Sequence, residues 1–144
     1  MFDRILLAVD DSDESKKAIR TAIGLAGATD GEVLVVHVHV KDMGYMVKDD
    51  IETRPEAEML LEAAVDLLRK ADVPVVGVMR VARADRGGEA ILKAAAEFGA
   101  DCIVVGSRGS GPFAQMLLGS VANQVVHLAH CPVLVAREAP RAAA

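Results

Sequence analysis

The stretch DCIVVGSRGSGPFAQMLLGSVANQVV, residues 101–126, decides the fold class of this 144-residue chain. It opens with a short, mostly apolar run that predicts a β-strand, and residues 121–130 have the apolar spacing of a helix. Four glycines and one proline lie between the two, within residues 106–120. A strand, a glycine-rich connection and a helix, in that order, indicate an α/β protein.

The rest of the chain alternates in the same way, because each strand-like run is followed by helical spacing. Strands that are apolar on both faces and joined by helices form a parallel sheet that is covered on both sides. We therefore expect one doubly wound α/β domain over residues 1–138, with a five-stranded sheet in the order 3-2-1-4-5 and a disordered tail at 139–144. Strands are predicted at residues 4–10, 32–40, 73–81, 101–105 and 132–136, and helices at 11–27, 53–70, 87–99 and 121–130.

The ends and faces of the helices also have local signals. Asp11, followed three residues later by Glu14, predicts a capping box at the first helix. Pro55 suits a first helical turn, and Gly99 suits a helix end. The inward face of the second helix is predicted to carry Leu60, Ala64, Leu67 and Leu68.

Composition excludes several classes of partner. The formal charge is −5 and the basic residues are scattered, which argues against non-specific nucleic-acid binding, since that depends on neutralising phosphates with Lys and Arg. The chain has no tryptophan, one tyrosine and three phenylalanines, too few for a platform on which single strands stack. No apolar run approaches the roughly 18 residues of a membrane span, and the N-terminus lacks a signal-peptide pattern. We expect a cytoplasmic protein.

The cysteines and two of the histidines raise the question of a metal site. Cys102 and Cys131 lie within or beside strand-like runs and fit no metal or redox spacing, so we expect buried, inert thiols. His37 and His39 are two residues apart on a strand, so their side chains share a face. Two imidazoles could begin a metal site, but no third ligand at a suitable spacing is visible. The alternative is a pair of structural histidines with satisfied hydrogen bonds.

The glycine loop lies where α/β proteins bind ligands. In the expected strand order the first and fourth strands are neighbours whose connections leave toward opposite faces, and ligands bind beyond the strand ends at such a switch point. Glycines let the backbone approach a ligand closely, and the free N–H groups of a helix beginning at Gly119-Ser120 favour an anion. The loop has no lysine, as a Walker loop would, and lacks the Rossmann glycine spacing. It nevertheless suits phosphates.

The spacing of these glycines matches a known signature. Gly106-x-x-Gly109, followed by nine residues and Gly119-Ser120, resembles the ATP-binding signature of the universal stress proteins. The segments ILLAVDDSDESKKAI, VVHV, ADCIVVGSRG and CPVLVA are similar to the same family. The resemblance covers nearly the whole chain, apart from residues 41–53 and the tail. It implies an adenine nucleotide alpha hydrolase-like fold.

The resemblance also implies a nucleotide site. Strand ends would border the adenine and ribose, the loop glycines would let the backbone pass close to ribose and phosphates, and the last helix would offer N–H groups to the phosphates. The residues in these positions are Ala8, Val9, Asp10, Val38, Val105, Gly106, Gly109, Gly119, Ser120, Val121 and Ala122. Many ATP-binding members have a small polar residue where this chain has Ala122, so one side-chain contact is expected to be missing.

Charged residues complete the candidate site. Arg108 either reaches the phosphates or faces solvent. Asp10 or Asp11 is a possible metal contact, with Mg2+ held mainly by the phosphates; Asp11 stands where many members have glycine and is otherwise a helix cap. An acidic pair after the first strand is also typical of phospho-accepting receiver domains. These need an aspartate directly after the third strand and a lysine after the fifth, whereas Asp85 comes several residues late and Arg137 follows the fifth strand.

The sequence therefore predicts an ATP-binding universal stress protein, a regulatory or stress-response module that binds ATP with Mg2+. Its edge strand, residues 131–137, is expected to pair with a second copy in a homodimer. One alternative is a slow Mg2+-dependent ATPase; fast turnover is disfavoured because the loop has neither a lysine nor an obvious water-activating residue. Another is a nucleotide-free dimeric scaffold, against which the intact glycine spacing argues. Residues 41–53 would form either a lid over the nucleotide or a contact with a partner.

Overall fold

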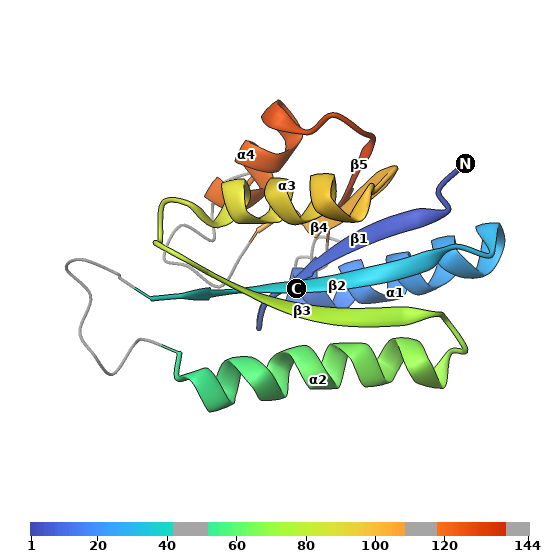
Figure 1. Ribbon diagram of the computed structural model, residues 1–144, viewed down its shortest axis with the longest axis horizontal. Helices are drawn as coiled ribbons and strands as arrows, with labels where there is room; N and C mark the ends of the chain where they lie inside the picture. Colours follow the sequence, from blue (N-terminus) through green and yellow to red (C-terminus); the bar gives the residue numbers. More distant parts are fainter. Residues whose placement is uncertain (42–51, 109–117, 138–144) are drawn as a thin grey trace, which may run out of the picture.

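The computed structural model describes residues 1–41, 52–108 and 118–137 (Figure 1). The chain is an α/β protein with a five-stranded parallel sheet in the order β3-β2-β1-β4-β5, which confirms the predicted topology. The predicted tail, most of the 41–53 connection and Gly109 lie outside the described residues. The elements are β1 (Arg4–Val9), α1 (Asp13–Thr29), β2 (Glu32–Val40), α2 (Arg54–Lys70), β3 (Val75–Ala82), α3 (Gly87–Phe98), β4 (Cys102–Gly106), α4 (Ser120–Leu128) and β5 (Val133–Ala136).

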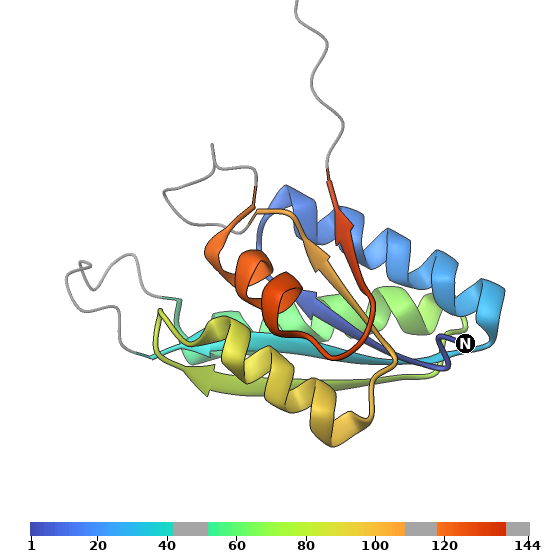
Figure 2. The same ribbon diagram turned by 90° about the horizontal axis from the view of Figure 1, so that it is seen from above.

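Two helices cover each face of the sheet. Figures 1 and 2 show α1 and α2 on one face and α3 and α4 on the other. Neighbouring residues of a strand point to opposite faces, so in β1 Leu7 packs on the α1 and α2 side while Leu6 packs on the α3 and α4 side. Both side chains are fully buried. Burial on both faces explains why the central strands β1, β2 and β4 are apolar almost throughout.

The helix ends confirm two predictions and correct one. Thr53 forms a capping box with Glu56 at the start of α2, next to a proline in the first turn, and Gly99 ends α3 with a positive φ of 73°. The N-cap of α1, however, is Ser12 and not Asp11, because the Ser12 hydroxyl accepts the N–H of Ser15 at 3.1 Å. The predicted capping box at Asp11 is therefore wrong.

Of the four residues predicted to face inward, Ala64 and Leu68 are buried and Leu60 is half-buried against the core, but Leu67 is not on the buried face of α2. Its buried residues are Ala57, Ala64, Val65 and Leu68, whereas Leu67 is 49% exposed. Each helical residue is rotated about 100° from the one before it, so Leu67 turns away from the stripe that ends at Leu68. Because Leu67 and Leu68 are adjacent and equally apolar, the sequence alone does not show which of them lies on the buried face.

The two cysteines lie on opposite faces of the sheet. Cys102 is fully buried on the α1 and α2 side, and burial raises the pKa of its thiol to about 11. Such a thiol is unreactive because the thiolate is the nucleophile. Cys131 packs on the α3 and α4 side and is only half-buried, so the prediction that both thiols are buried is wrong for Cys131.

Candidate functional site

The carboxyl ends of β1 and β4 meet at the switch point of the sheet. The two strands are hydrogen-bonded neighbours, with Leu7 of β1 aligned to Val104 of β4. The chain leaves β1 toward α1 on one face and leaves β4 toward α4 on the other (Figure 1). This is the arrangement at which doubly wound sheets bind ligands.

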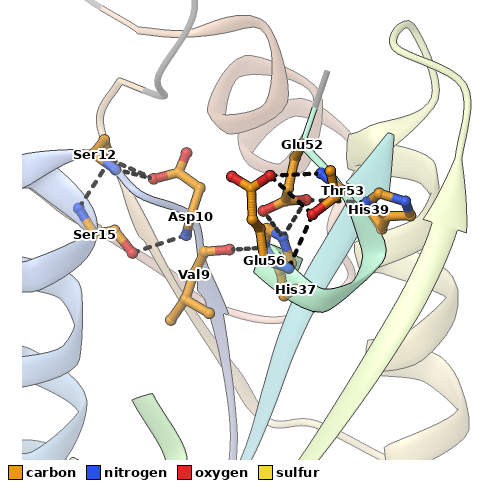
Figure 3. Close-up of polar contacts among 9 residues, drawn as sticks. All are labelled: Val9, Asp10, Ser12, Ser15, His37, His39, Glu52, Thr53 and Glu56. Atoms are coloured by element: carbon orange, nitrogen blue, oxygen red, sulfur yellow. Dashed lines mark hydrogen bonds and ion pairs between the residues drawn. The ribbon is translucent and has the colours of Figure 1, made fainter. Parts of the chain in front are cut away.

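Asp10, the residue after β1, is held by two serines of the α1 start (Figure 3). Its N–H donates to the Ser15 hydroxyl at 2.9 Å, and its Oδ1 accepts the N–H of Ser12 at 2.9 Å and the Ser12 hydroxyl. Burial raises the pKa of Asp10, while the hydrogen bonds from Ser12 act in the opposite direction. The turn therefore buries the Asp10 carboxylate, and the hydrogen bonds from Ser12 offset only part of the cost of burying its charge.

Arg108, the cation of the glycine loop, pairs with α1. Its Nη2 lies 2.9 Å from Oε1 of Glu14, whose side chain is only 11% exposed. The Arg108 side chain is 38% exposed, so it is neither buried nor simply solvent-facing, and its contact with phosphates stays a prediction. The Arg108 carbonyl also lies 3.3 Å from the Ser12 hydroxyl. The first residues of the loop are thus attached to the first turn of α1.

The start of α4 is hydrogen-bonded to the end of β4 through its N-cap residue. Its N-cap, Gly119, is extended (φ −67°, ψ 165°), and no side chain among the described residues caps it. The Gly119 N–H donates to the Ser107 carbonyl at 2.7 Å, and the Ser107 N–H donates to the Ala136 carbonyl at 2.8 Å. The first-turn N–H groups from Ser120 onward have no partner within the helix. They form the kind of donor set that binds an anion.

Other predicted site residues fall on two faces of the sheet. Ala8, Val38 and Val105 all pack on the α3 and α4 side, the face on which α4 lies. Val9 packs on the opposite face, with α1 and α2, so only its backbone can face a ligand beside α4. Ala122 is buried in the apolar cluster beneath α4, and Val121 is half-buried beside it.

A cluster of His37, His39 and Glu52, which we call the His37–Glu52 cluster, lies beside Val9 (Figure 3). His37 is buried, with Nδ1 2.8 Å from the Val9 carbonyl oxygen and Nε2 2.9 and 3.0 Å from the two Glu52 oxygens. His39 Nδ1 lies 3.1 Å from Glu52 Oε2. Both histidines are therefore hydrogen-bonded, as the structural alternative predicted.

Sequence reasoning did not find Glu52, because it lies in the long connection where no periodic pattern operates. The one local signal near Glu52 is the capping box of α2. Its first residue is Thr53, and Glu52 directly precedes it. Within residues 1–41, 52–108 and 118–137, no group of three or more His, Cys, Asp or Glu side chains could hold a metal ion. Nor is any helix in that part of the chain both long and apolar enough to cross a membrane.

Comparisons with known proteins agree with this architecture. The sequence profile of the universal stress protein family matches residues 1–137. A universal stress protein of Thermus aquaticus is 36% identical over 143 residues, which cover 95% of this chain and 100% of the relative. A solved universal stress protein of Archaeoglobus fulgidus has a TM-score of 0.74 at 30% identity, covering 94% of this chain and 99% of that one.

A second solved structure carries a ligand. The universal stress protein from Archaeoglobus fulgidus in complex with dAMP has a TM-score of 0.69 at 28% identity. The match covers 94% of this chain and 98% of that chain. The family profile, the sequence relatives and the fold all agree, and this chain belongs to the universal stress protein family.

Proposed function

We propose that the protein binds ATP at the carboxyl ends of β1 and β4 and acts as a nucleotide-dependent regulatory module in stress response. The observation that carries the proposal is the start of α4 at the switch point of the sheet, which no side chain of the described residues caps. It supplies N–H donors for phosphates at the place where doubly wound folds bind ligands. The related Archaeoglobus protein solved with dAMP, 28% identical to this chain, supports an adenine nucleotide as the ligand.

Each part of the site has a physical role in this proposal. The N–H groups of Ser120, Val121 and Ala122, with the exposed Ser120 hydroxyl, hold the phosphates. Ala8, Val38 and Val105 on the same face of the sheet provide a wall of small apolar residues for adenine. Asp10, already oriented by serines, accepts from the ribose hydroxyls.

We propose that Mg2+ binds together with the nucleotide. This ion keeps several of its waters and is usually bound through substrate phosphates together with one or two carboxylates. Oδ1 of Asp10 already accepts two hydrogen bonds from Ser12, and Asp11 is exposed. We therefore assign Mg2+ mainly to the ATP phosphates, with Asp10 or Asp11 as its carboxylate contact.

The site is better suited to holding ATP than to hydrolysing it. Phosphoryl transfer needs cations aimed at the transferred group and a residue that positions the attacking water. Arg108 is instead paired with the largely buried Glu14. We expect a binding protein whose nucleotide persists for much longer than a catalytic cycle.

Direct binding tests the proposal. Calorimetric titration with Mg2+-ATP is expected to show one site per chain, and mass spectrometry of the natively purified protein is expected to find an adenine nucleotide. Binding of GTP should be at least about tenfold weaker, because the apolar wall offers no partner for the polar edge groups of guanine. No heat signal at about 1 mM ATP, together with no co-purified nucleotide, would overturn the proposed function.

We further propose a homodimer that forms through the free edge of β5. The strand carries the exposed Leu134, and the neighbouring α4 carries the exposed Val126 and Leu128. An exposed apolar edge strand tends to pair with another chain. The carbonyls of Pro132 and Ala136 accept N–H groups from the β4 side. Because strand residues alternate in direction, the polar groups of Val135 face the free edge.

Val135→Pro is expected to convert the dimer to a monomer. Proline removes one N–H donor from the free edge without removing a donor to β4, so the subunit should stay folded. Light scattering at micromolar concentration measures the mass, and circular dichroism checks the fold. A wild-type protein that is already monomeric, or a variant that remains dimeric, would contradict pairing through this edge.

A further inference from the structure

The His37 ring lies between two hydrogen-bond acceptors (Figure 3). The Val9 carbonyl oxygen, 2.8 Å from Nδ1, can only accept, so Nδ1 carries a proton and donates it. In a neutral ring Nε2 would then present a lone pair. That lone pair would face both oxygens of Glu52, at 2.9 and 3.0 Å. The contact is attractive only if a further proton lies between the ring and the carboxyl group.

The surroundings of Glu52 favour placing that proton on His37. A carboxylate can accept hydrogen bonds from both histidines, and His39 Nδ1 lies 3.1 Å from Oε2. A protonated carboxyl group would turn one of these oxygens into a donor, which only the Nε2 lone pair of a neutral His37 could accept. Glu52 also directly precedes Thr53, the N-cap of α2, where the helix dipole favours negative charge. The stable arrangement is an imidazolium that donates to a carboxylate.

We propose that His37 is a doubly protonated positioning residue of the nucleotide site, which joins Glu52 at the start of α2 to the Val9–Asp10 end of β1. This inference rests on the proposed function. The hydrogen bond to the Val9 carbonyl fixes the last residue of β1, and Asp10 follows directly. Loss of the Nε2 proton would set a lone pair against the Glu52 carboxylate and loosen both contacts.

The charge of His37 also reaches Asp10. Burial raises the pKa of Asp10, and the nearby Asp11 raises it further, whereas the charge of His37 acts in the opposite direction. A charged His37 therefore helps to keep the ribose-facing carboxylate ionised. In the register of the sheet the β3 residue beside His37 is Met79, which does not titrate. The described titratable groups around His37 are Asp10 and Asp11 after β1, His39 on β2, and Glu52 and Glu56 at the start of α2.

Nitrogen NMR of the histidine rings tests the proton directly, without any nucleotide. At about pH 7 both ring nitrogens of His37 are expected to give imidazolium shifts in the wild type. His37→Asn assigns the signals among the four histidines. In Glu52→Gln the ring should become neutral, with the proton on Nδ1. The matched control is Glu58→Gln, which removes one negative charge from the exposed face of α2, where Glu58 pairs only with Arg54 among the described residues.

Nucleotide affinity tests the positioning role. The protonation of free ATP changes with pH in the same way for every variant, so it cancels in the ratio of the Glu52→Gln Kd to the wild-type Kd. The ratio therefore reports only changes in the protein. We expect a ratio of about ten at a pH where the ring spectrum shows His37 protonated, and a ratio near one at a higher pH where the spectrum shows it neutral. Glu58→Gln should match wild type at both values. A structural role alone would give a ratio that does not change with pH.

The two measurements separate this inference from the proposed function. If no form of the protein binds ATP, the proposed function is wrong, while the ring spectrum still decides the protonation of His37. A neutral His37 in the wild type at about pH 7 overturns the inference, and so does a Kd ratio that is flat across the pH range. The wild-type spectrum gives its answer even if Glu52→Gln does not fold.

Discussion

Gly119→Val is expected to fold like the wild type and to bind ATP at least about a hundredfold more weakly. Gly119 has φ −67° and ψ 165°, an extended conformation that valine adopts without strain. Its glycine identity is therefore not required by the backbone. The branched side chain would occupy the space through which phosphate oxygens approach the first turn of α4.

The size of this effect follows from the hydrogen bonds to phosphate that the valine side chain would block. Each charge at a helix N-terminus contributes about 0.3–1 kcal/mol, and up to about 2 kcal/mol when it is partly buried. Blocking several such interactions, with a steric clash added, should cost at least about 3 kcal/mol of binding free energy. Calorimetric titration measures the reduced affinity, and thermal unfolding checks that the variant is native.

Asn123→Val provides the matched control for Gly119→Val. It places the same side chain on the same helix one turn later, at an exposed position. Any general cost of valine in α4 should appear in both variants, whereas the loss of affinity should appear only at Gly119. A folded Gly119→Val protein that binds ATP as tightly as Asn123→Val would show that α4 does not hold the phosphates.

The elements that sequence predicted well are those with a local physical cause. β2 spans residues 32–40 as its β-branched run predicts, and Gly99 ends α3 in the left-handed conformation that favours glycine. The parallel sheet follows from apolar strands that need cover on both faces, and its order from right-handed crossovers through helices on both faces. The switch point, and with it the place of the candidate site, follows from that order.

The features that sequence missed depend on competition or on contacts between distant segments. The sequence pattern placed the cap of α1 at Asp11, whereas the cap is the next residue, Ser12, whose N–H is bound by the Asp10 carboxylate. Arg108 pairs with Glu14 across 94 positions of sequence, which no local pattern can indicate. Glu52 reaches His37 from a connection without periodicity.

At Gly106, a contact between segments far apart in sequence gives a different reason for a glycine than the sequence suggested. The sequence suggested that this glycine leaves room for the nucleotide. In the structure, a Cβ built on Gly106 would lie 2.9 Å from the Cβ of Glu14 and 3.1 Å from its carbonyl carbon. Backbone atoms of a helix cannot move aside as the end of a flexible side chain can. Gly106 therefore allows the end of β4 to pack closely against the first turn of α1.

Gly106→Ala is accordingly expected to lower the free energy of unfolding by about 2 kcal/mol, within the usual range for overpacking a close contact. Gly24→Ala, in the interior of α1 with nothing within 4 Å of the added Cβ, is the control and should raise it by about 0.5–1 kcal/mol. The same chemical change thus has opposite signs at the two positions. Denaturant unfolding of both variants measures them. If Gly106→Ala were as stabilising as Gly24→Ala, β4 and α1 would not be packed as closely as described, and the Arg108–Glu14 pair that depends on this packing would lose its support.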